Sequence, residues 1–114
     1  MRERDFIGKK IDVSKIEMLA FAYFFDKTFD RPVIDVDLND LDREADTGAD
    51  FNRYSVRVHL TGDRISAIRR IGHREKSGED EDVELLRFPY NSLENQAQDR
   101  LRILVTELSP SASD

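Results

Sequence analysis

Apolar and polar side chains alternate through Tyr54-Ser55-Val56-Arg57-Val58-His59-Leu60, and a second apolar run returns from Arg64 to Ile71. Alternation with a period of two is the pattern of a β-strand that buries one face. Between the two runs, Thr61-Gly62-Asp63 has the glycine-first chemistry of a tight hairpin turn. The sequence therefore predicts a β-hairpin whose turn residues are Gly62 and Asp63.

This turn fixes the register of the hairpin, because the strands pair outward from it. The pairs expected on the apolar face are Leu60 with Ile65, Val58 with Ala67, and Val56 with Arg69. The opposite, more polar face is expected to collect Ser55, Arg57, His59, Arg64, Ser66, Ile68 and Arg70.

Two further strands are predicted on either side of the hairpin. Val33 to Leu38 is β-branched and partly alternating, which indicates a half-buried strand. Val83 to Phe88 indicates another, and its broken alternation allows a β-bulge. The acidic stretch 39–53 and the charged stretch 72–82 have no apolar period, so both are predicted to be loops. The first is long for a compact domain, and loops of that length are often functional.

A first helix is predicted before these strands. Ser14 and Glu17 have the spacing of a capping box ahead of an apolar run. The helix should extend from Lys15 to Phe29 and end before Pro32, because the residue that precedes a proline is disfavoured in a helix.

A second helix is expected to extend to about Leu108, with Asn91 or Ser92 as its N-terminal cap. Its apolar residues fall in one stripe: Leu93, Ala97, Leu101, Leu104 and Leu108. The element order is then α-β-β-β-β-α, which predicts an α+β two-layer sandwich. In it, both helices cover one face of a mainly antiparallel four-stranded sheet. At 114 residues the chain is long enough for one domain, taken as residues 1–108, followed by a disordered polar tail at 109–114.

The first predicted helix is apolar on two opposite faces, so it needs two partners. One face can pack on the sheet. The other is predicted to contact a protein, most simply a second copy, because twofold dimers are the commonest oligomers. Core packing within the monomer is the alternative for that face. The interaction residues that we predict are Met18, Phe21, Phe25 and Phe29.

The alternative function is nucleic-acid binding by an arginine-rich hairpin face. Arginine suits phosphate geometry, and five arginines cluster in this region: Arg57, Arg64, Arg69, Arg70 and Arg74. A net charge of −6 opposes binding of polyanions by the whole molecule. A structural interpretation competes with this function, in which Arg57 and Arg70 pair across neighbouring strands with Asp35 and Asp37.

The acidic segments offer weaker candidates. Asp35 to Asn39 resembles the start of a calcium-binding loop, but Asp40 stands where glycine is needed, so a strand that runs into an acidic loop is the simpler interpretation. The loop 39–53 could instead meet a cation or a basic partner. Cysteine is absent, which excludes disulfides and cysteine-based zinc sites. We predict no metal site and no cofactor.

Catalysis is not the predicted function. The candidate bases are His59 and His73, and neither has a nucleophile nearby in the sequence or a glycine-rich phosphate loop. We therefore expect a non-enzymatic interaction or regulatory module that is cytoplasmic, with no membrane-spanning segment and no secretion signal. The excess of arginine over lysine is typical of a GC-rich prokaryotic or phage genome.

Overall fold

The computed structural model describes residues 3–19, 21–38 and 51–110, with the backbone alone for 17–19. Its main element is an antiparallel sheet in the strand order β1-β2-β3-β4-β5, so that each strand pairs with the next one along the chain. The strands are β1 (Ala22–Asp26), β2 (Arg31–Leu38), β3 (Arg53–Thr61), β4 (Arg64–Lys76) and β5 (Glu79–Leu85). Two short 3₁₀ helices, Glu3–Asp5 and Val13–Leu19, precede the sheet, and one α-helix, α1 (Asn91–Glu107), follows it.

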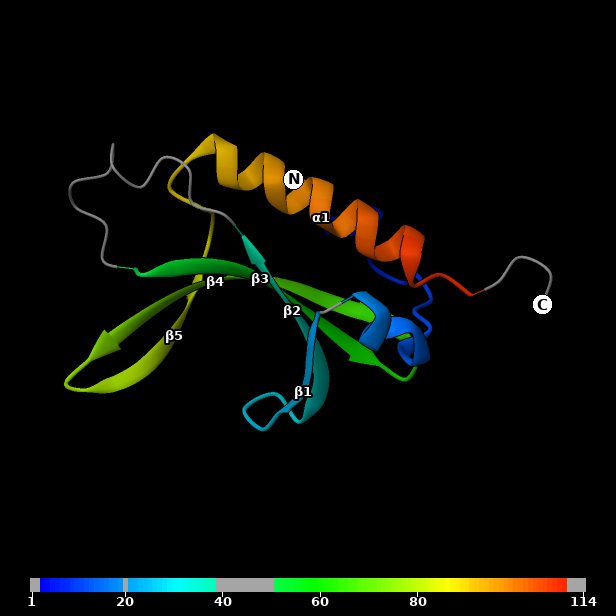
Figure 1. Cartoon of the computed structure of the whole chain (residues 1–114), viewed down its shortest axis with the longest axis horizontal. Coiled ribbons are helices and arrows are strands. Elements are labelled where there is room, and N and C mark those ends of the chain that lie inside the picture. The colour runs from blue at the N-terminus through cyan, green and yellow to red at the C-terminus, as the bar shows by residue number, and fades with distance from the viewer. Residues whose placement is uncertain (1–2, 20, 39–50, 111–114) are drawn as a thin grey trace.

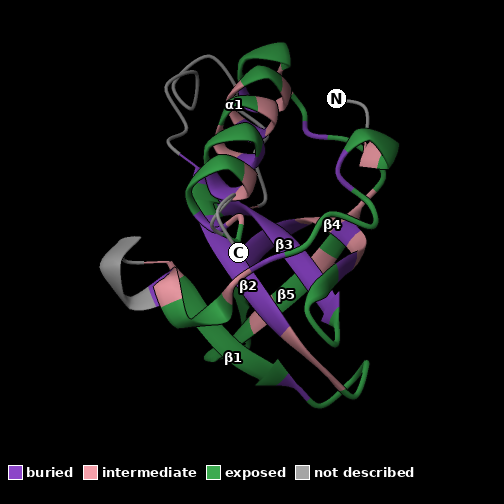
Figure 2. Ribbon diagram, turned by 90° about the vertical axis from the view of Figure 1, so that its right-hand side faces the viewer, coloured by how far each residue is buried: buried purple, intermediate pink, exposed green. Residues whose placement is uncertain are grey.

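The sheet is curled, and α1 covers one of its faces. In Figure 1, α1 lies above the middle of the sheet, while β1 and β5 curve away from it on the other side. Figure 2 shows β2 and β3 largely buried beneath the helix and β1 exposed at the edge. The molecule is therefore of the α+β class, with an apolar layer between α1 and the sheet and a second face that α1 does not cover.

The main core lies between α1 and the sheet, as the C-terminal pattern predicted. Four helix residues at the expected spacing are buried there, together with Leu108 just after the helix: Leu93, Ala97, Leu101 and Leu104. The residue that caps the helix is Tyr90 rather than Asn91 or Ser92. Ile103 points away from the sheet and is 55% exposed.

The predicted helix from Lys15 to Phe29 is wrong. Its first part is the 3₁₀ helix Val13–Leu19 and its second part is β1. Ser14 donates from its backbone N and its Oγ to Asp12 Oδ1, at 3.1 and 2.6 Å, so it does not begin a capping box. β1 forms because aromatic residues favour strands. The apolar residues that would lie on two opposite sides of a helix lie instead on the two faces of this strand.

The predicted hairpin forms, but a β-bulge changes its register. Leu60 pairs with Ile65 as expected, whereas His59 pairs with Ala67, so that Ser66 is an extra residue in β4. The Ser66 hydroxyl donates to the His59 carbonyl oxygen at 3.2 Å. Beyond the bulge every β4 side chain lies on the face opposite to the predicted one. The observed pairs are Val58 with Ile68, Val56 with Arg70, and Arg57 with Arg69.

The segment 72–82, predicted to be a loop, belongs to strands. β4 continues to Lys76, and β5 begins at Glu79. Ser77 and Gly78 join them with φ values of 56° and 81°, as in a type I′ turn. Oppositely charged residues face each other in this ladder, among them Arg74 with Glu81 and Lys76 with Glu79. Such pairs stabilise strands that carry few apolar residues.

The sheet thus has five strands where four were predicted. The predicted strand Val83–Phe88 begins earlier and ends at Leu85. Most of the predicted acidic loop, residues 39–50, lies outside the described residues, and so do residues 111–114 of the predicted tail.

Candidate functional site

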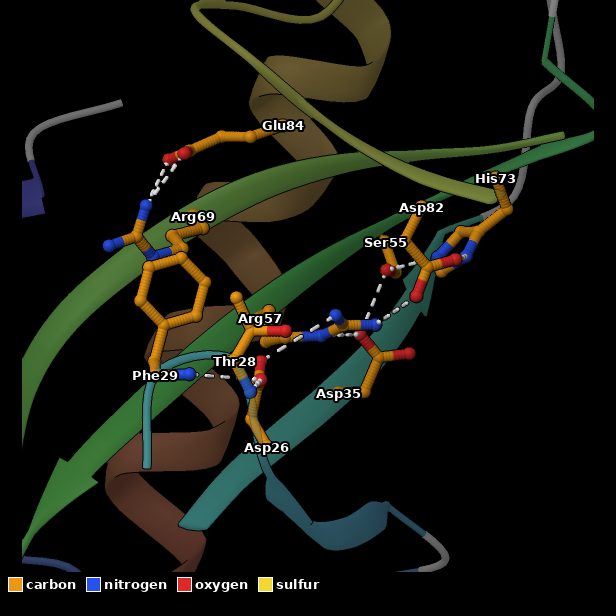
Figure 3. Close-up of polar contacts among 10 residues, drawn as sticks. All are labelled: Asp26, Thr28, Phe29, Asp35, Ser55, Arg57, Arg69, His73, Asp82 and Glu84. Atoms are coloured by element: carbon orange, nitrogen blue, oxygen red, sulfur yellow. Dashed lines mark hydrogen bonds and ion pairs between the residues drawn. The ribbon is translucent and has the colours of Figure 1, made fainter. Parts of the chain in front are cut away.

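The face of the sheet opposite α1 is polar and yet buried. Six polar or charged residues with little exposure lie on it: Asp26, Asp35, Ser55, Arg57, His59 and His73. No α-helix of the described chain covers this face. The curl of the sheet and the turn between β1 and β2 shield it instead (Figures 1 and 3).

Arg57, only 8% exposed, is the centre of this face. Its Nε donates to Asp35 Oδ1 in β2 at 3.3 Å, and its Nη2 donates to Asp82 Oδ2 in β5 at 3.1 Å. Nη1 lies 4.0 Å from Asp26 Oδ2 in β1, which is an ion-pair distance but too long for a hydrogen bond. One guanidinium therefore joins three strands.

Ser55 and His73 close a ring of hydrogen bonds with these carboxylates (Figure 3). His73 Nδ1 lies 2.7 Å from Asp82 Oδ1, and His73 Nε2 lies 2.7 Å from Ser55 Oγ. Ser55 Oγ donates to Asp35 Oδ1 at 2.9 Å. The ring thus passes through β2, β3, β4 and β5, and Arg57 completes it.

The order Ser55, His73, Asp82 resembles a hydrolytic triad, but its hydrogen bonds run in another direction. In a triad the serine hydroxyl donates to the histidine, which can then accept the proton. Here the Ser55 hydroxyl donates to Asp35, and Ser55 is fully buried. A substrate carbonyl cannot reach this oxygen, so the geometry favours a structural role for the ring.

Asp82 is held in its ionised form by the same contacts. Partial burial opposes ionisation, but the hydrogen bonds from His73 and Arg57 outweigh it and keep the pKa of this carboxyl below its ordinary value. Asp82 is the member of the ring that lies nearest the surface, with its side chain 44% exposed.

The turn between β1 and β2 folds over this face. Asp26 Oδ1 accepts hydrogen bonds from the backbone N of Thr28 at 2.9 Å and of Phe29 at 3.4 Å. This local bonding brings the Phe29 ring between two side chains of the face. The ring meets His59 edge-on with centroids 5.1 Å apart, and the Arg69 guanidinium carbon lies 3.9 Å from its centroid.

A cleft of about 440 Å³ opens between this turn and β5. Its apolar lining comes from Phe24, Phe25, Phe29 and Ile71. Its charged lining comes from Asp26, Lys27, Arg57, Arg69, Asp82 and Glu84. The two edge strands of the sheet contribute to the same cleft because the sheet is curled.

The predicted arginines do not gather in one patch. Arg57 and Arg69 lie on the cleft face, and Arg69 Nη1 donates to both carboxylate oxygens of Glu84 at 2.6 Å. Arg70 is on the α1 face, where it pairs with Glu94 and Glu3. Arg74 pairs with Glu81, and Arg64 donates to the Gly8 carbonyl oxygen near the hairpin turn.

The expected cross-strand pairs are present only in part. Arg57 meets Asp35 as the structural interpretation predicted, whereas Asp37 pairs with Arg53 at 2.9 Å. The bulge at Ser66 is the reason that Arg70 is absent from this face.

The predicted apolar contact residues lie on and around β1. Phe25 is 56% exposed, Phe29 is partly exposed in the turn, and Phe21 packs against the main core. The side chain of Met18 lies outside the described residues.

The ring of polar residues was missed by sequence reasoning, because its members come from four strands. His73 and Asp82 were assigned to a loop, and Asp26, which forms an ion pair with Arg57 beside the ring, was assigned to a helix. The one local signal was the alternation of Ser55, Arg57 and His59 on a single strand face, which placed those three correctly on one side.

The described residues contain neither a metal-binding cluster nor a membrane-spanning helix. Among residues 3–38 and 51–110, apart from residue 20, no group of three or more His, Asp or Glu side chains is placed to hold a metal ion. In the same part of the chain, no helix is long and apolar enough to cross a membrane. The candidate cation segment 39–50 lies outside the residues described.

Comparison with known proteins assigns no relative to this chain, since no family model, no curated protein and no solved structure matches it.

Proposed function

We propose that the protein is a non-enzymatic interaction module that pairs with a second copy of itself through the free edge of β1. The observation that supports this function is the exposure of large aromatic side chains on an edge strand. Tyr23 is 46% exposed and Phe25 is 56% exposed. An edge strand offers unpaired backbone groups, and apolar side chains beside them favour pairing with another strand.

The two edge strands of the sheet differ in charge, and this difference favours β1 as the strand that pairs with a second copy. The other edge, β5, carries five acidic residues: Glu79, Asp80, Glu81, Asp82 and Glu84. Two copies paired through β5 would bring like charges together, which opposes association. β1 carries one acid, Asp26, and that carboxylate is directed into the cleft.

A hollow beside β1 supports a second copy as the partner. It has a volume of about 480 Å³ and is lined by Val13, Ser14, Ile16, Phe21 and Tyr23. Tyr23 pairs with Ile34 of the main core, so the hollow lies on the α1 side of the strand. In an antiparallel pair of β1 strands centred on Phe24, Phe25 of the second copy stands opposite Tyr23. Its ring then reaches this hollow.

The ring of Ser55, His73 and Asp82 supports a function without catalysis. Its hydroxyl is buried and donates to Asp35, which leaves no accessible nucleophile there. The five predicted arginines are distributed over both faces of the sheet. Arg57, Arg69, Arg70 and Arg74 form ion pairs and Arg64 donates to a backbone carbonyl oxygen, so within the described residues they do not form one surface that favours nucleic acid.

Light scattering of the full chain tests the pairing. We expect the wild type to show twice the monomer mass, and Phe25→Asp to show the monomer mass with unchanged circular dichroism. Ile103→Asp is the matched control, because Ile103 is equally exposed but lies on α1. A monomeric wild type, or a dimeric Phe25→Asp, would contradict the proposal.

Disulfide trapping tests the register, and the chain has no cysteine of its own to interfere. Residues directly opposite in an antiparallel pair have Cα atoms about 4.5–5.5 Å apart, which is within disulfide range. Phe24→Cys should therefore crosslink to its own copy under mild oxidation. Ala22→Cys should not, because the same register places it opposite Asp26. Crosslinking of Ala22→Cys alone would show that the register is wrong.

A further inference from the structure

The cleft beneath the β1–β2 turn has the size and lining of a small-molecule site. Its volume of about 440 Å³ is within the range of ligand pockets, and apolar walls with a few fixed polar groups are their usual lining. Phe24 and Phe29 form walls whose faces contact the guanidinium groups of Arg57 and Arg69. The hydrogen-bonding capacity that remains on its polar groups therefore determines which ligands it can bind.

The carboxylates of the lining are already engaged. Both oxygens of Glu84 accept from Arg69, and the two oxygens of Asp82 accept from Arg57 and contact His73. Within the described contacts, the lining acids therefore keep few free acceptors, and Asp26 Oδ2 is the least engaged of them.

The donors of the lining are less fully used. Arg57 Nη1 has only the 4.0 Å ion pair with Asp26. Arg69 Nε is buried and has no hydrogen-bond partner among the described residues. Because spare donors exceed spare acceptors, the cleft favours a ligand that brings acceptor oxygens.

Phe29 covers further unsatisfied groups. His59 is almost fully buried, and neither of its ring nitrogens has a hydrogen-bond partner in the described chain. A buried polar atom without a partner is costly and calls for an explanation. The Phe29 ring lies against both His59 and Arg69, so the two residues that carry the unsatisfied atoms contact the same side chain (Figure 3 shows Phe29 against Arg69).

The turn that carries Phe29 is a short segment with one constrained residue. Asp30 has a φ of 56°, in the left-handed region that non-glycine residues seldom adopt. Phe29 itself is partly exposed. Rotation of this ring outward would uncover His59 and Arg69 without moving a strand.

We propose that this cleft binds an organic carboxylate with an apolar body, and that Phe29 is the lid which the ligand displaces. The carboxylate would accept hydrogen bonds from Arg57, Arg69 and His59, and the apolar body would lie along Phe24 and Ile71. This site does not depend on the pairing of β1, since its donors come from β3 and β4.

Three probes of nearly equal shape and different charge test the ligand class: benzoate, benzamide and benzylamine. In NMR titrations of the full-length ¹⁵N-labelled protein, benzoate should produce saturable shifts in the Arg57 and Arg69 Nε–H signals and in the amides of residues 27–30. Benzamide and benzylamine should leave these signals unchanged at the same millimolar concentration. Saturable binding of benzylamine instead, equal shifts with all three probes, or none with benzoate would overturn the proposal.

Two variants test the roles of the residues. Arg69→Gln should weaken benzoate binding about tenfold, because it replaces a charged donor with a shorter, neutral polar side chain. Phe29→Ala should strengthen it, since no lid has to be displaced. Leu86→Ala, at a residue that is 99% exposed and does not line the cleft, is the matched control. Unchanged affinity in Arg69→Gln, with a native-like spectrum, would contradict the site. Weaker binding in Phe29→Ala would show that Phe29 is part of the binding surface rather than a lid.

Discussion

Arg57 Nη2 donates to Asp82 Oδ2 at 3.1 Å, although the two residues lie in β3 and β5, which are not neighbours in the sheet. In a flat sheet, strands separated by one other strand lie about 9–10 Å apart. Side chains from such strands meet most easily when the sheet curls toward the face that carries them. The contact therefore links the curvature of the sheet to a specific hydrogen bond, with His73 of β4 bonded to the same carboxylate.

Asp82→Asn should destabilise the protein by about 1–3 kcal/mol, because His73 and Arg57 contact different oxygens of Asp82 and asparagine turns an NH2 group toward one of them. Urea unfolding measures this loss. Asp63→Asn is the control: the Asp63 side chain forms an exposed ion pair with Lys10 at 3.7 Å, so its replacement should change the free energy of unfolding by less than about 0.5 kcal/mol. Equal effects of the two substitutions would contradict a structural role for the ring.

The pH dependence of stability should include a contribution from His59. Burial, followed by the positive charge of Arg69, lowers the pKa of His59 from 6.5 to about 4. Between these values the unfolded chain binds a proton that the folded protein does not, so the free energy of unfolding falls as the pH decreases through this window. Below about pH 4 both states are protonated and this contribution no longer changes.

His59→Leu isolates that contribution, since leucine does not titrate. Unfolding curves of the two proteins between about pH 6.5 and about pH 4 should show a smaller loss of stability in the variant. The carboxylates contribute to both proteins alike. Parallel curves would mean that His59 takes up its proton as readily in the folded state as in the unfolded one.

Arg70→Met should weaken the attachment of α1 to the sheet. Arg70 donates to Glu94 at 2.6 and 3.1 Å and also pairs with Glu3. In Arg70→Met the partly buried Glu94 carboxylate loses its arginine donor. The free energy of unfolding, measured by heat or urea, should fall by about 1.5–3 kcal/mol. Arg102→Met is the control, because Arg102 makes only an exposed pair with Asp99.

The same variant should raise the pKa of Glu94. In the wild type, burial opposes ionisation, but hydrogen bonds from Arg70 and from the Phe88 backbone N lower the pKa of this carboxyl. The contribution of ionised Glu94 to the free energy of unfolding is complete at pH values above the ordinary carboxyl pKa. It is lost as the pH falls through the lowered pKa of the folded state. NMR titration of the Glu94 carboxyl in Arg70→Met should therefore show a higher pKa than in the wild type.

Gly72→Ala should destabilise the protein by about 1–3 kcal/mol through a steric clash. A Cβ atom at residue 72 would lie 2.7–2.9 Å from three ring atoms of Phe51. In a Phe51→Ala background the same substitution should cost clearly less, and the difference between the two costs is measured by a double-mutant cycle. Equal costs in both backgrounds would show that the backbone conformation, and not Phe51, excludes alanine.

The regular parts of the fold could be predicted because their patterns are local. The turn at Gly62 and Asp63 was visible in the sequence, and so was the stripe of Leu93, Ala97 and Leu101 in α1. β1 was not, because its consecutive aromatic residues can be distributed over two sides of a helix as well as over the two faces of a strand. For such a short apolar run, periodicity alone does not separate the two structures.

The candidate site could not be predicted, because it depends on one unpaired residue in β4 and on contacts between strands that are far apart in the sequence. The extra residue Ser66 places Arg69 and His73 on the face of Arg57, and Arg70 on the face of α1. Asp35 and Asp82 are 47 positions apart in the chain and are linked through Arg57 on one side of the ring and through Ser55 and His73 on the other. Local sequence contains neither relationship.

The bulge at Ser66 also determines how this protein can change over evolutionary time. Loss of that single residue would leave a regular ladder with the same pairs on both sides of it, because Ser66 is the residue without a partner. Arg70 would stay on the face of α1, and Ile71 on the face of the cleft. A one-codon deletion at this position thus spares the composition of the cleft, whereas a deletion within a regular ladder exchanges the two faces of a strand.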